Sequence, residues 1–277
     1  MTEALAYHPE IVIIATPSAM HLEIAQAAAE AGCNLFIEKP LGHELHGLDQ
    51  LLAVAQDKKL IVMVGCQFRF HPLFMELRSM IEGGMMGRIV GAAAEYGDYL
   101  PAWHPWEDHR QSYSARLDLG GGAILTLIHP MDYLYSLFGK WRRIQAMTAR
   151  VPCLGTPAGE DWCDINVEFE NGVLAHIHVD YIQWPATHRL NIVGELGRVI
   201  CDFNAGEMKW RSVEGDTRLS KVPSGFERNT MFLDELKHFL SCVSDRTQPQ
   251  VSLADGIAAL KMALEARSVA SLGREHG

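Results

Sequence analysis

The feature that most constrains the fold is an alternation of apolar runs and helical patterns that fills the chain up to about residue 87. The run EIVIIAT at 10–16 is continuous and β-branched, which is typical of a strand buried on both faces of a parallel sheet. A helical pattern, MHLEIAQAAAEAG, follows it, and two further strand and helix pairs come after. This β-α order predicts right-handed crossovers and a doubly wound parallel sheet. The remaining segments of the series are NLFIEK, HELHGLDQLLAVAQDKK, LIVMVGCQF and HPLFMELRSMIEGG.

The pattern changes at about residue 88. Apolar and polar residues alternate from there, and turn signals such as ENG at 170–172 and GELG at 194–197 join the segments. Helical patterns cover 120–139, about 230–243 and 254–272. We therefore expect a parallel unit over 1–87, and an α+β unit over 88–277 with a largely antiparallel open sheet and helices on one face.

Composition excludes several classes of protein. The net charge of −10 argues against a nucleic-acid partner, whose electrostatic footprint is basic. No apolar run has the length of a membrane span, and the first ten residues lack the pattern of a signal peptide. The six cysteines are scattered without CxxC pairs, which favours reduced thiols and a cytoplasmic location.

Two predicted strands end in residues that suit a ligand site. ATPSAMH at 15–21 and EKP at 38–40 follow the first two strands, and open α/β sheets bind ligands at the carboxyl ends of their strands. A lysine there can stabilise a charge that develops on a substrate oxygen. The alternative, with about equal weight, is a surface Lys39 paired with Glu38 in a turn made by Pro40.

The segment GGGAILTLIHPMDYLYSLFG carries a second group of candidates. Glycines at 120–122 allow the backbone to approach a neighbour closely. Thr126, His129 and Asp132 recur at three-residue spacing, so they share one face of a helix, and histidine suits proton transfer near neutral pH. A packing histidine on an amphipathic helix is the alternative. Pro130 predicts a kink beside His129.

Three further stretches carry polar candidates. WHPWEDHRQSY at 103–113 suits either a polyhydroxylated ligand or an interface, because it mixes aromatic and charged residues. Arg69 follows the third strand and suits an anion or sugar contact. His176 and His178 lie two apart on a strand and face the same side. A metal would need a third ligand that no spacing supplies, so we favour a solvent-facing pair.

Taken together, VIIATPSAMH, AAAEAGCNLFIEKPLG, FRFHP, GGGAILTLIHPMDYLYSLFG and VGELGRV resemble the Gfo/Idh/MocA family of NAD(P)-dependent oxidoreductases over essentially the whole chain. The resemblance implies a Rossmann domain over 1–87, and a substrate-binding and oligomerisation domain over 88–277. It implies NAD or NADP as cofactor, and a sugar, inositol or nucleotide-sugar hydroxyl as the site of hydride removal. It also implies a homodimer or homotetramer that forms through the C-terminal sheet.

The resemblance also assigns roles to residues. Lys39 and His129 match the family's catalytic lysine and histidine. The cofactor contacts that it implies are Thr16, Pro17, His21, Glu38, Lys39 and Pro40. The substrate contacts that we expect are Arg69, Asp108, Arg110, Tyr113, Thr126 and Asp132.

The sequence departs from the family pattern in two respects. Thr126 stands where relatives carry an aspartate one turn before the histidine, and a threonine cannot stabilise an imidazolium as a carboxylate does. No GxGxxG occurs, so we expect that the chain lacks the first part of its Rossmann domain and that cofactor binding by this chain alone is weakened. A catalytically inactive sugar-binding or oligomeric scaffold is therefore the alternative to a dehydrogenase.

Overall fold

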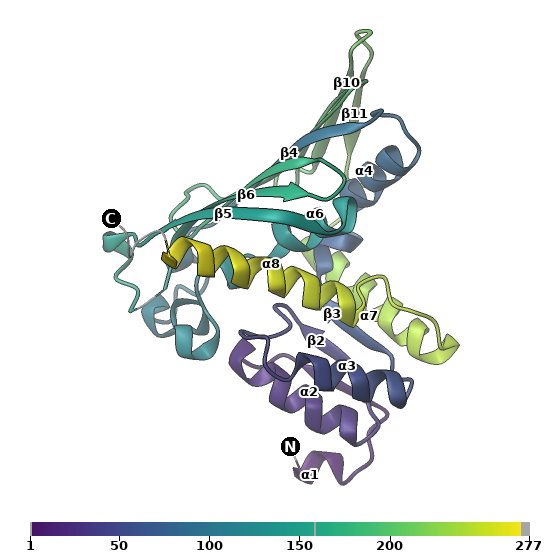
Figure 1. Cartoon of the computed structure of the whole chain (residues 1–277), viewed down its shortest axis with the longest axis vertical. Coiled ribbons are helices and arrows are strands. Elements are labelled where there is room, and N and C mark those ends of the chain that lie inside the picture. The colour runs from purple at the N-terminus through teal and green to yellow at the C-terminus, as the bar shows by residue number, and fades with distance from the viewer. Residues whose placement is uncertain (1, 158, 273–277) are drawn as a thin grey trace.

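The computed structural model describes residues 2–157 and 159–272, which form two sheets with helices between and around them (Figure 1). The smaller sheet has the strand order β1-β2-β3, and both of its strand pairs are parallel. This confirms the parallel sheet expected for the first part of the chain. The strands are β1 (Ile11–Ile14), β2 (Asn34–Glu38) and β3 (Val62–Gly65).

The helices of this first part follow from their apolar residues. In α2 (His21–Glu30), Ala25, Ala28 and Ala29 are fully buried, and their small side chains let the helix lie close to the strands. The next helix begins at Leu48, later than the sequence pattern predicts, because Gly47 adopts a left-handed conformation with φ 83° just before it. The elements that complete this part are α1 (Thr2–Leu5), α3 (Leu48–Asp57) and α4 (Pro72–Glu82).

The larger sheet has eight strands in the order β11-β10-β9-β8-β4-β7-β6-β5. Every neighbouring pair is antiparallel except β4 with β7, so the expectation of a largely antiparallel sheet is confirmed. The predicted turns at ENG and GELG join β6 to β7 and β8 to β9. The strands are β4 (Ile89–Gly97), β5 (Trp141–Ala149), β6 (Trp162–Phe169), β7 (Leu174–Asp180), β8 (Thr187–Gly194), β9 (Gly197–Asp202), β10 (Glu207–Ser212) and β11 (Thr217–Lys221).

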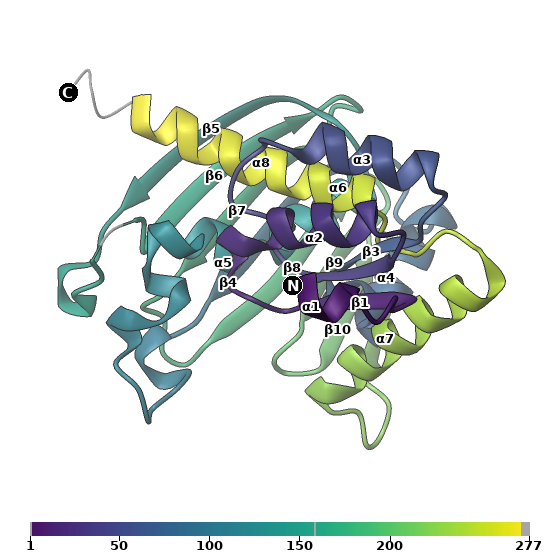
Figure 2. The same ribbon diagram turned by 90° about the horizontal axis from the view of Figure 1, so that it is seen from below.

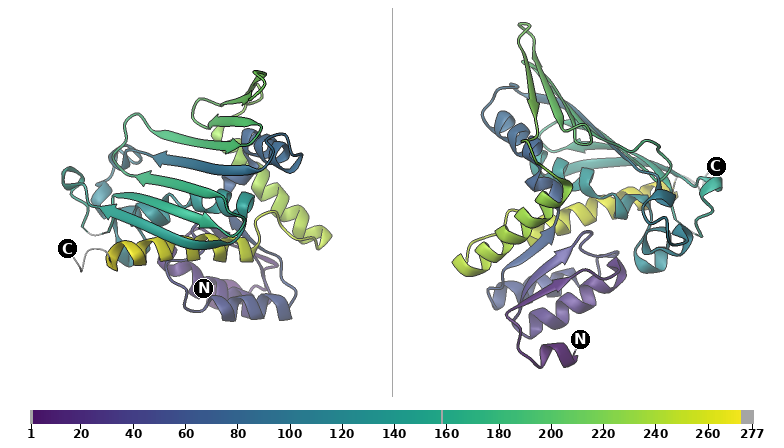
Figure 3. Two further views of the ribbon diagram at one scale, coloured as in Figure 1. Left: turned by 45° about the horizontal axis from the view of Figure 1, so that its top comes forward. Right: turned by 180° about the vertical axis from the view of Figure 1, so that it is seen from behind.

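Helices cover one face of the large sheet and leave the other face open (Figure 3). Ile165, Ile177 and Leu190 point toward the helices and are fully buried. The long C-terminal helix crosses below this sheet, and α2 and α3 lie beneath it (Figure 2). The helices that contact this sheet are α4, α5 (Ala123–Thr126), α6 (His129–Phe138) and α8 (Leu253–Leu272), whereas α7 (Arg228–Asp245) packs mainly on the short helix at 67–70.

The C-terminal helices also contact the first sheet. Phe239 of α7 packs edge-on against Phe36 of β2 with ring centroids 5.6 Å apart, and Ser252 forms an isolated β-bridge with Met63 of β3. The two parts of the chain therefore share a packed boundary, and their division at residues 87 and 88 stays a prediction. None of the described helices combines the length and apolar character that a membrane crossing requires.

Candidate active site

Lys39 follows the carboxyl end of β2 and reaches toward the large sheet. Its ammonium nitrogen Nζ donates a hydrogen bond to the backbone carbonyl oxygen of Thr126 at 2.7 Å. The predicted alternative, a surface ion pair with Glu38, is not formed among the described residues. The side chain of Lys39 is half-buried, so its cation lies between the two parts of the chain.

The glycines at 120–122 bring the segment before α5 close to its neighbours. Gly120 has φ 86°, and a Cβ there would lie 2.8 Å from the Cβ of Ser18, on the loop after β1. A Cβ at Gly121 would lie 2.3 Å from the carbonyl oxygen of Tyr113. The close approach predicted for these glycines is therefore made to the protein's own loops, and it brings the strand-end loops of the first sheet next to α5.

His129 begins α6 and is 1% exposed. The helix predicted over 120–139 is interrupted between α5 and α6, and Pro130 occupies the first turn of α6, where its missing N–H requires no partner. The ring of Phe68 packs against the imidazole with a centroid separation of 4.8 Å, and Nδ1 has no hydrogen-bond partner among the described residues.

Burial is the main cause that lowers the pKa of His129 well below its ordinary value, and the nearby Lys39 cation lowers it further. The imidazole is consequently neutral near pH 7 and able to accept a proton. Lys39 and His129 were predicted as the catalytic pair from different parts of the chain. They lie close enough for the Lys39 cation to lower the pKa of His129.

His21 connects the two strand-end loops. It is buried, and its ring nitrogens lie 2.8 Å from the carbonyl oxygen of Thr16 and 2.9 Å from that of Pro40. Burial lowers the pKa of His21 and outweighs the two backbone hydrogen bonds that raise it. A neutral ring carries one N–H and donates to only one of these two carbonyls. The predicted cofactor residues therefore form one edge, on which Thr16 is exposed while Pro17, Glu38 and Lys39 are half-buried.

Arg69 and Asp132 lie together in the interior. Two guanidinium nitrogens donate to the carboxylate of Asp132 at 2.7 and 2.9 Å, and the two residues are 2% and 0% exposed. Arg69 also lies 3.7 Å from Asp255 of α8. Because each side chain satisfies the other, the pair joins the short helix after β3 (Gln67–Phe70) to α6 instead of opening to a pocket.

Of the remaining predicted substrate residues, Thr126 lies buried at the end of α5, and the other three lie on the loop at 103–113. Asp108 and Arg110 are exposed and pair with each other at 2.8 Å, while Tyr113 is 38% exposed. No hydrogen bond or ion pair connects Asp108 or Arg110 to Lys39 or His129 within the described ranges. Their role in substrate binding stays a prediction.

Sequence reasoning missed a pocket of about 420 Å³, one of whose walls is Phe68, the residue that packs against His129. Tyr96 of β4 and His188 of β8 line it on the helix-covered face of the sheet, with Asp98 after β4 and Arg228 at the start of α7. The signal in the sequence was His188, a polar residue in a predicted strand. The next two residues that point to the same side of that strand, Leu190 and Ile192, are apolar. Alternation places all three on the buried face.

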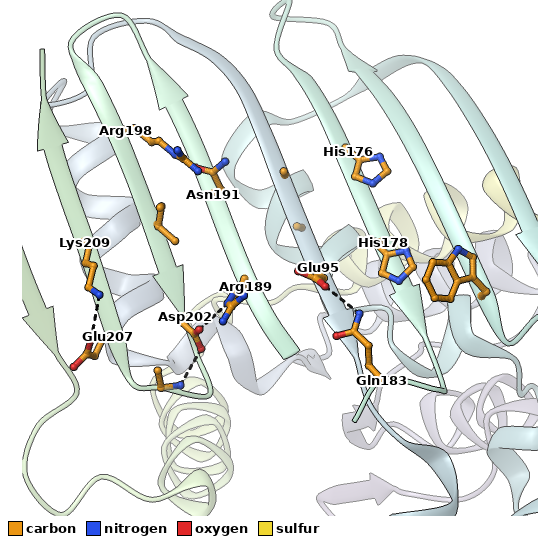
Figure 4. Close-up of a pocket in the computed structure, with 15 residues that line it drawn as sticks. Glu95, His176, His178, Gln183, Arg189, Asn191, Arg198, Asp202, Glu207 and Lys209 are labelled. Atoms are coloured by element: carbon orange, nitrogen blue, oxygen red, sulfur yellow. Dashed lines mark hydrogen bonds and ion pairs between the residues drawn. The ribbon is translucent and has the colours of Figure 1, made fainter. Parts of the chain in front are cut away.

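A larger hollow, of about 800 Å³, lies on the open face of the sheet (Figure 4). His176 and His178 both line it, as their spacing predicts. Only His176 faces solvent, at 46% exposure, because His178 is 10% exposed and is held by Asp164 at 2.8 Å and Asp180 at 3.0 Å. Burial lowers the pKa of His178, but its hydrogen bonds to the two carboxylates outweigh that effect and raise it. Among the described residues, no group of three or more His, Cys, Asp or Glu side chains is arranged so that it could hold a metal ion.

Comparison with known proteins identifies the family of both parts of the chain. Residues 2–66 match the model of the oxidoreductase family with an NAD-binding Rossmann fold, and residues 74–200 match the GFO/IDH/MocA C-terminal domain. The chain is 24% identical to 1,5-anhydro-D-fructose reductase of Ensifer adhaerens, over 98% of this chain and 81% of the relative. It is 26% identical to inositol 2-dehydrogenase of Rhizobium meliloti, over 94% and 78% of the two chains.

The fold is also shared with solved structures. Levoglucosan dehydrogenase in complex with NADH and levoglucosan superposes with a TM-score of 0.85 at 20% identity, covering 95% of this chain and 78% of that one. The match to the model of the oxidoreductase family with an NAD-binding Rossmann fold places the chain among nicotinamide-dependent oxidoreductases. The chain belongs to the Gfo/Idh/MocA family, whose members are NAD(P)-dependent oxidoreductases that act on sugar hydroxyls.

Proposed function

We propose that this protein is a dehydrogenase that oxidises a ring hydroxyl of a sugar, an inositol or a nucleotide-linked sugar, with NAD or NADP as hydride acceptor. The observation that carries the proposal is the convergence of Lys39 and His129, which lie 90 residues apart in sequence and meet where the first sheet faces the second. The relatives support the substrate class, because their names describe anhydrosugar and inositol chemistry.

His129 is the proton acceptor in this proposal. It is neutral near pH 7, and no hydrogen bond to Nδ1 competes with a substrate hydroxyl among the described residues. Lys39 stabilises the substrate oxygen as the C–O bond gains carbonyl character, because its cation is fixed in a partly buried site of reduced dielectric. The hydrogen bond to the Thr126 carbonyl sets the direction of the ammonium.

The residues at the strand ends fit the nicotinamide end of the cofactor, which supplies the hydride acceptor when bound. His21 lies between the two loops, with its ring nitrogens 2.8 Å from the carbonyl oxygen of Thr16 and 2.9 Å from that of Pro40, so it brings the two loops together beside Lys39. Arg69 and Asp132 are buried and pair with each other, so they hold α6, the helix that begins at His129, in position. This favours a positioning role over direct contact with substrate.

The open face of the large sheet supports self-association, as the family resemblance implies. It presents polar side chains, including Arg189, Asp202 and Lys209, around the hollow of Figure 4. A homodimer or homotetramer would cover this face. Light scattering after size exclusion would test it, and a monomer at every concentration would contradict it.

The test of the proposed function is cofactor binding followed by turnover. NADH and NADPH are titrated while nicotinamide fluorescence is recorded, and inositols and hexoses are then assayed with the cofactor that binds. We expect the cofactor to bind saturably. We also expect absorbance at the band of the reduced nicotinamide to rise as the substrate is oxidised. Absence of binding at millimolar cofactor would favour the inactive scaffold, which the relatives compared above do not support.

A further inference from the structure

The third glycine of the segment at 120–122 lies against an ion pair that the proposed reaction does not use. Gly122 has φ 99°, and a Cβ there would lie 2.5 Å from Oε1 of Glu160 and 2.8 Å from Nη2 of Arg267. These two side chains, one just before β6 and the other on α8, pair at 2.8 Å and are 7% and 24% exposed. The ion pair therefore fills the space that a side chain at residue 122 would need, which explains the glycine.

Glu160 satisfies the first N–H groups of α5. Its backbone carbonyl accepts the N–H of Ala123 at 2.9 Å, and its Oε1 accepts the N–H of Ile124 at 3.2 Å. The N–H groups at the start of a helix have no partner within the helix, so these bonds complete it. Because α5 has only four residues and a single turn is not stable in isolation, its position depends on such outside partners.

Arg267 ties the same segment to α8. Its Nη2 donates to the carbonyl oxygen of Gly121 at 3.0 Å and to Oε1 of Glu160 at 2.8 Å. Its Nε is buried and makes no hydrogen bond to any residue that the structure describes. Both bonds therefore come from one nitrogen atom. A lysine ammonium, which has three donors, can replace that nitrogen without losing either bond.

The short helix α5 connects this ion pair to the proposed active site. Four helical residues span only about 6 Å, and the last of them, Thr126, accepts the hydrogen bond from Nζ of Lys39 on its backbone carbonyl at 2.7 Å. Since the acceptor is a backbone atom, the placement of α5 decides where it lies. We propose that Glu160 and Arg267 are positioning residues that fix the Thr126 carbonyl and, through it, the ammonium of Lys39. The inference rests on the proposed function.

The alternative is that the ion pair acts on stability alone. Ala123, Ile124 and Leu125 are fully buried, so packing could place α5 without help from Glu160 and Arg267. The two roles differ in what they predict for Lys39. A pair that only adds stability leaves its ammonium held in the folded protein, whereas a positioning pair does not.

The first measurement needs neither cofactor nor substrate, so that it remains readable if the dehydrogenase activity fails. In NMR spectra of the whole protein with isotopically labelled lysine nitrogen, an ammonium signal is sharp where a hydrogen bond slows exchange with water. The signal of Lys39 is assigned by its absence in Lys39→Met. Arg267→Met removes both bonds, and Arg267→Lys keeps a donor nitrogen. Trp141→Phe is the matched control, because it removes a different hydrogen bond of α8, from Nε1 to Glu265 at 2.9 Å.

We expect the Lys39 signal to be lost in Arg267→Met and kept in Arg267→Lys and Trp141→Phe. In turnover assays, Arg267→Met should lower kcat by roughly 10- to 100-fold, as a displacement of about 1 Å does in other active sites. KM should change little, because Lys39 acts on charge that develops in the transition state. Arg267→Lys should recover most of kcat. If Arg267→Met does not fold, Arg267→Met with Glu160→Gln removes the same bonds and leaves no uncompensated buried charge.

Three results would overturn the proposal. One is a Lys39 signal and a kcat that Arg267→Met leaves unchanged, and another is a loss that Arg267→Lys does not recover or that Trp141→Phe shares. The third is the absence of a Lys39 signal in the unmodified protein, because the ammonium would then not be held. If the unmodified protein turns over no sugar, the proposed function fails, and the ammonium signal alone decides whether the ion pair positions Lys39.

Discussion

The ammonium nitrogen of Lys39 lies 2.7 Å from the backbone carbonyl oxygen of Thr126. This bond joins the end of a parallel strand to the last residue of α5, three positions before His129. Because the acceptor is a backbone atom, the side chain of residue 126 is not needed for it. The position of the lysine is therefore compatible with threonine at a site where relatives carry an aspartate.

Replacing Lys39 tests its role directly. In Lys39→Met, the cation that stabilises the substrate oxygen is lost while most of the side-chain length is kept. We expect kcat/KM for the best sugar substrate to fall by about 10²- to 10³-fold, as when one stabilising donor is removed from other active sites. The matched control is Lys140→Met, an exposed lysine between α6 and β5. Full turnover in Lys39→Met would refute the assignment.

The pH dependence of kcat/KM tests His129. Its pKa is lowered by burial first and by Lys39 second, so the free enzyme keeps a neutral imidazole down to below pH 6.5. Activity should be level through pH 6.5 and fall only in more acidic buffer, as the ring gains a proton. In Lys39→Met one lowering cause is removed, so the acid limb should move to higher pH. A limb unchanged by this substitution would mean that Lys39 and His129 do not interact.

The Arg69–Asp132 pair is expected to act through stability. Removing one partner leaves the other as an uncompensated buried charge, which costs about 3–5 kcal/mol in such pairs. Arg69→Met should therefore lower the free energy of unfolding by that amount in urea titrations. The double variant Arg69→Met with Asp132→Leu should lower it by less than the sum of the two single substitutions. The exposed pair Arg78–Glu82, with nitrogen and oxygen 2.7 Å apart, is the control, and Arg78→Met should cost less than about 1 kcal/mol. A cost at Arg69 equal to that at Arg78 would contradict a buried structural role.

Much of the fold could be predicted because its signals are local. Continuous β-branched runs specify buried parallel strands, and alternation with turn residues specifies the antiparallel sheet. The strand end at Lys39 is equally local, whereas the helix expected over 120–139 is divided into α5 and α6, and only a kink was predicted beside His129. The pairing of Arg69 with Asp132 was not predictable, because it depends on how two distant helices pack. An arginine after a strand has the same local pattern whether it contacts a ligand or a buried carboxylate.

The pocket at His188 was missed for a related reason. A single polar residue in a strand is ordinary, and its meaning depends on which face of the sheet is covered. That face is decided by helices such as α4 and α6, which lie far from β8 in sequence. Only the assembled layers show that both nitrogens of this ring are buried beside His129.

Glu235 of α7 gives the sharpest prediction about stability and pH. It is 1% exposed, and its Oε2 atom has no hydrogen-bond partner among the described residues. Burial raises its pKa from 4.5 to about 9, with further contributions from the negative charges of Glu38 and Asp132. In the folded chain the carboxyl is therefore protonated near pH 7, whereas in the unfolded chain it is ionised.

The sign of the effect follows from that difference. The pKa of Glu235 is higher in the folded than in the unfolded chain. Its contribution to the free energy of unfolding is therefore fully present below pH 4.5 and is lost as the pH rises from 4.5 toward 9. Glu235→Gln keeps the shape of the side chain and cannot ionise. We expect it to raise the free energy of unfolding at pH 8 by a few kcal/mol, at roughly 1.4 kcal/mol for each unit of pKa difference that is relieved, and to change it little at pH 5. Urea titrations of both proteins at the two pH values measure this. The exposed Glu82→Gln serves as control, and an equal effect at pH 5 and pH 8 would show that Glu235 is ionised in the folded protein.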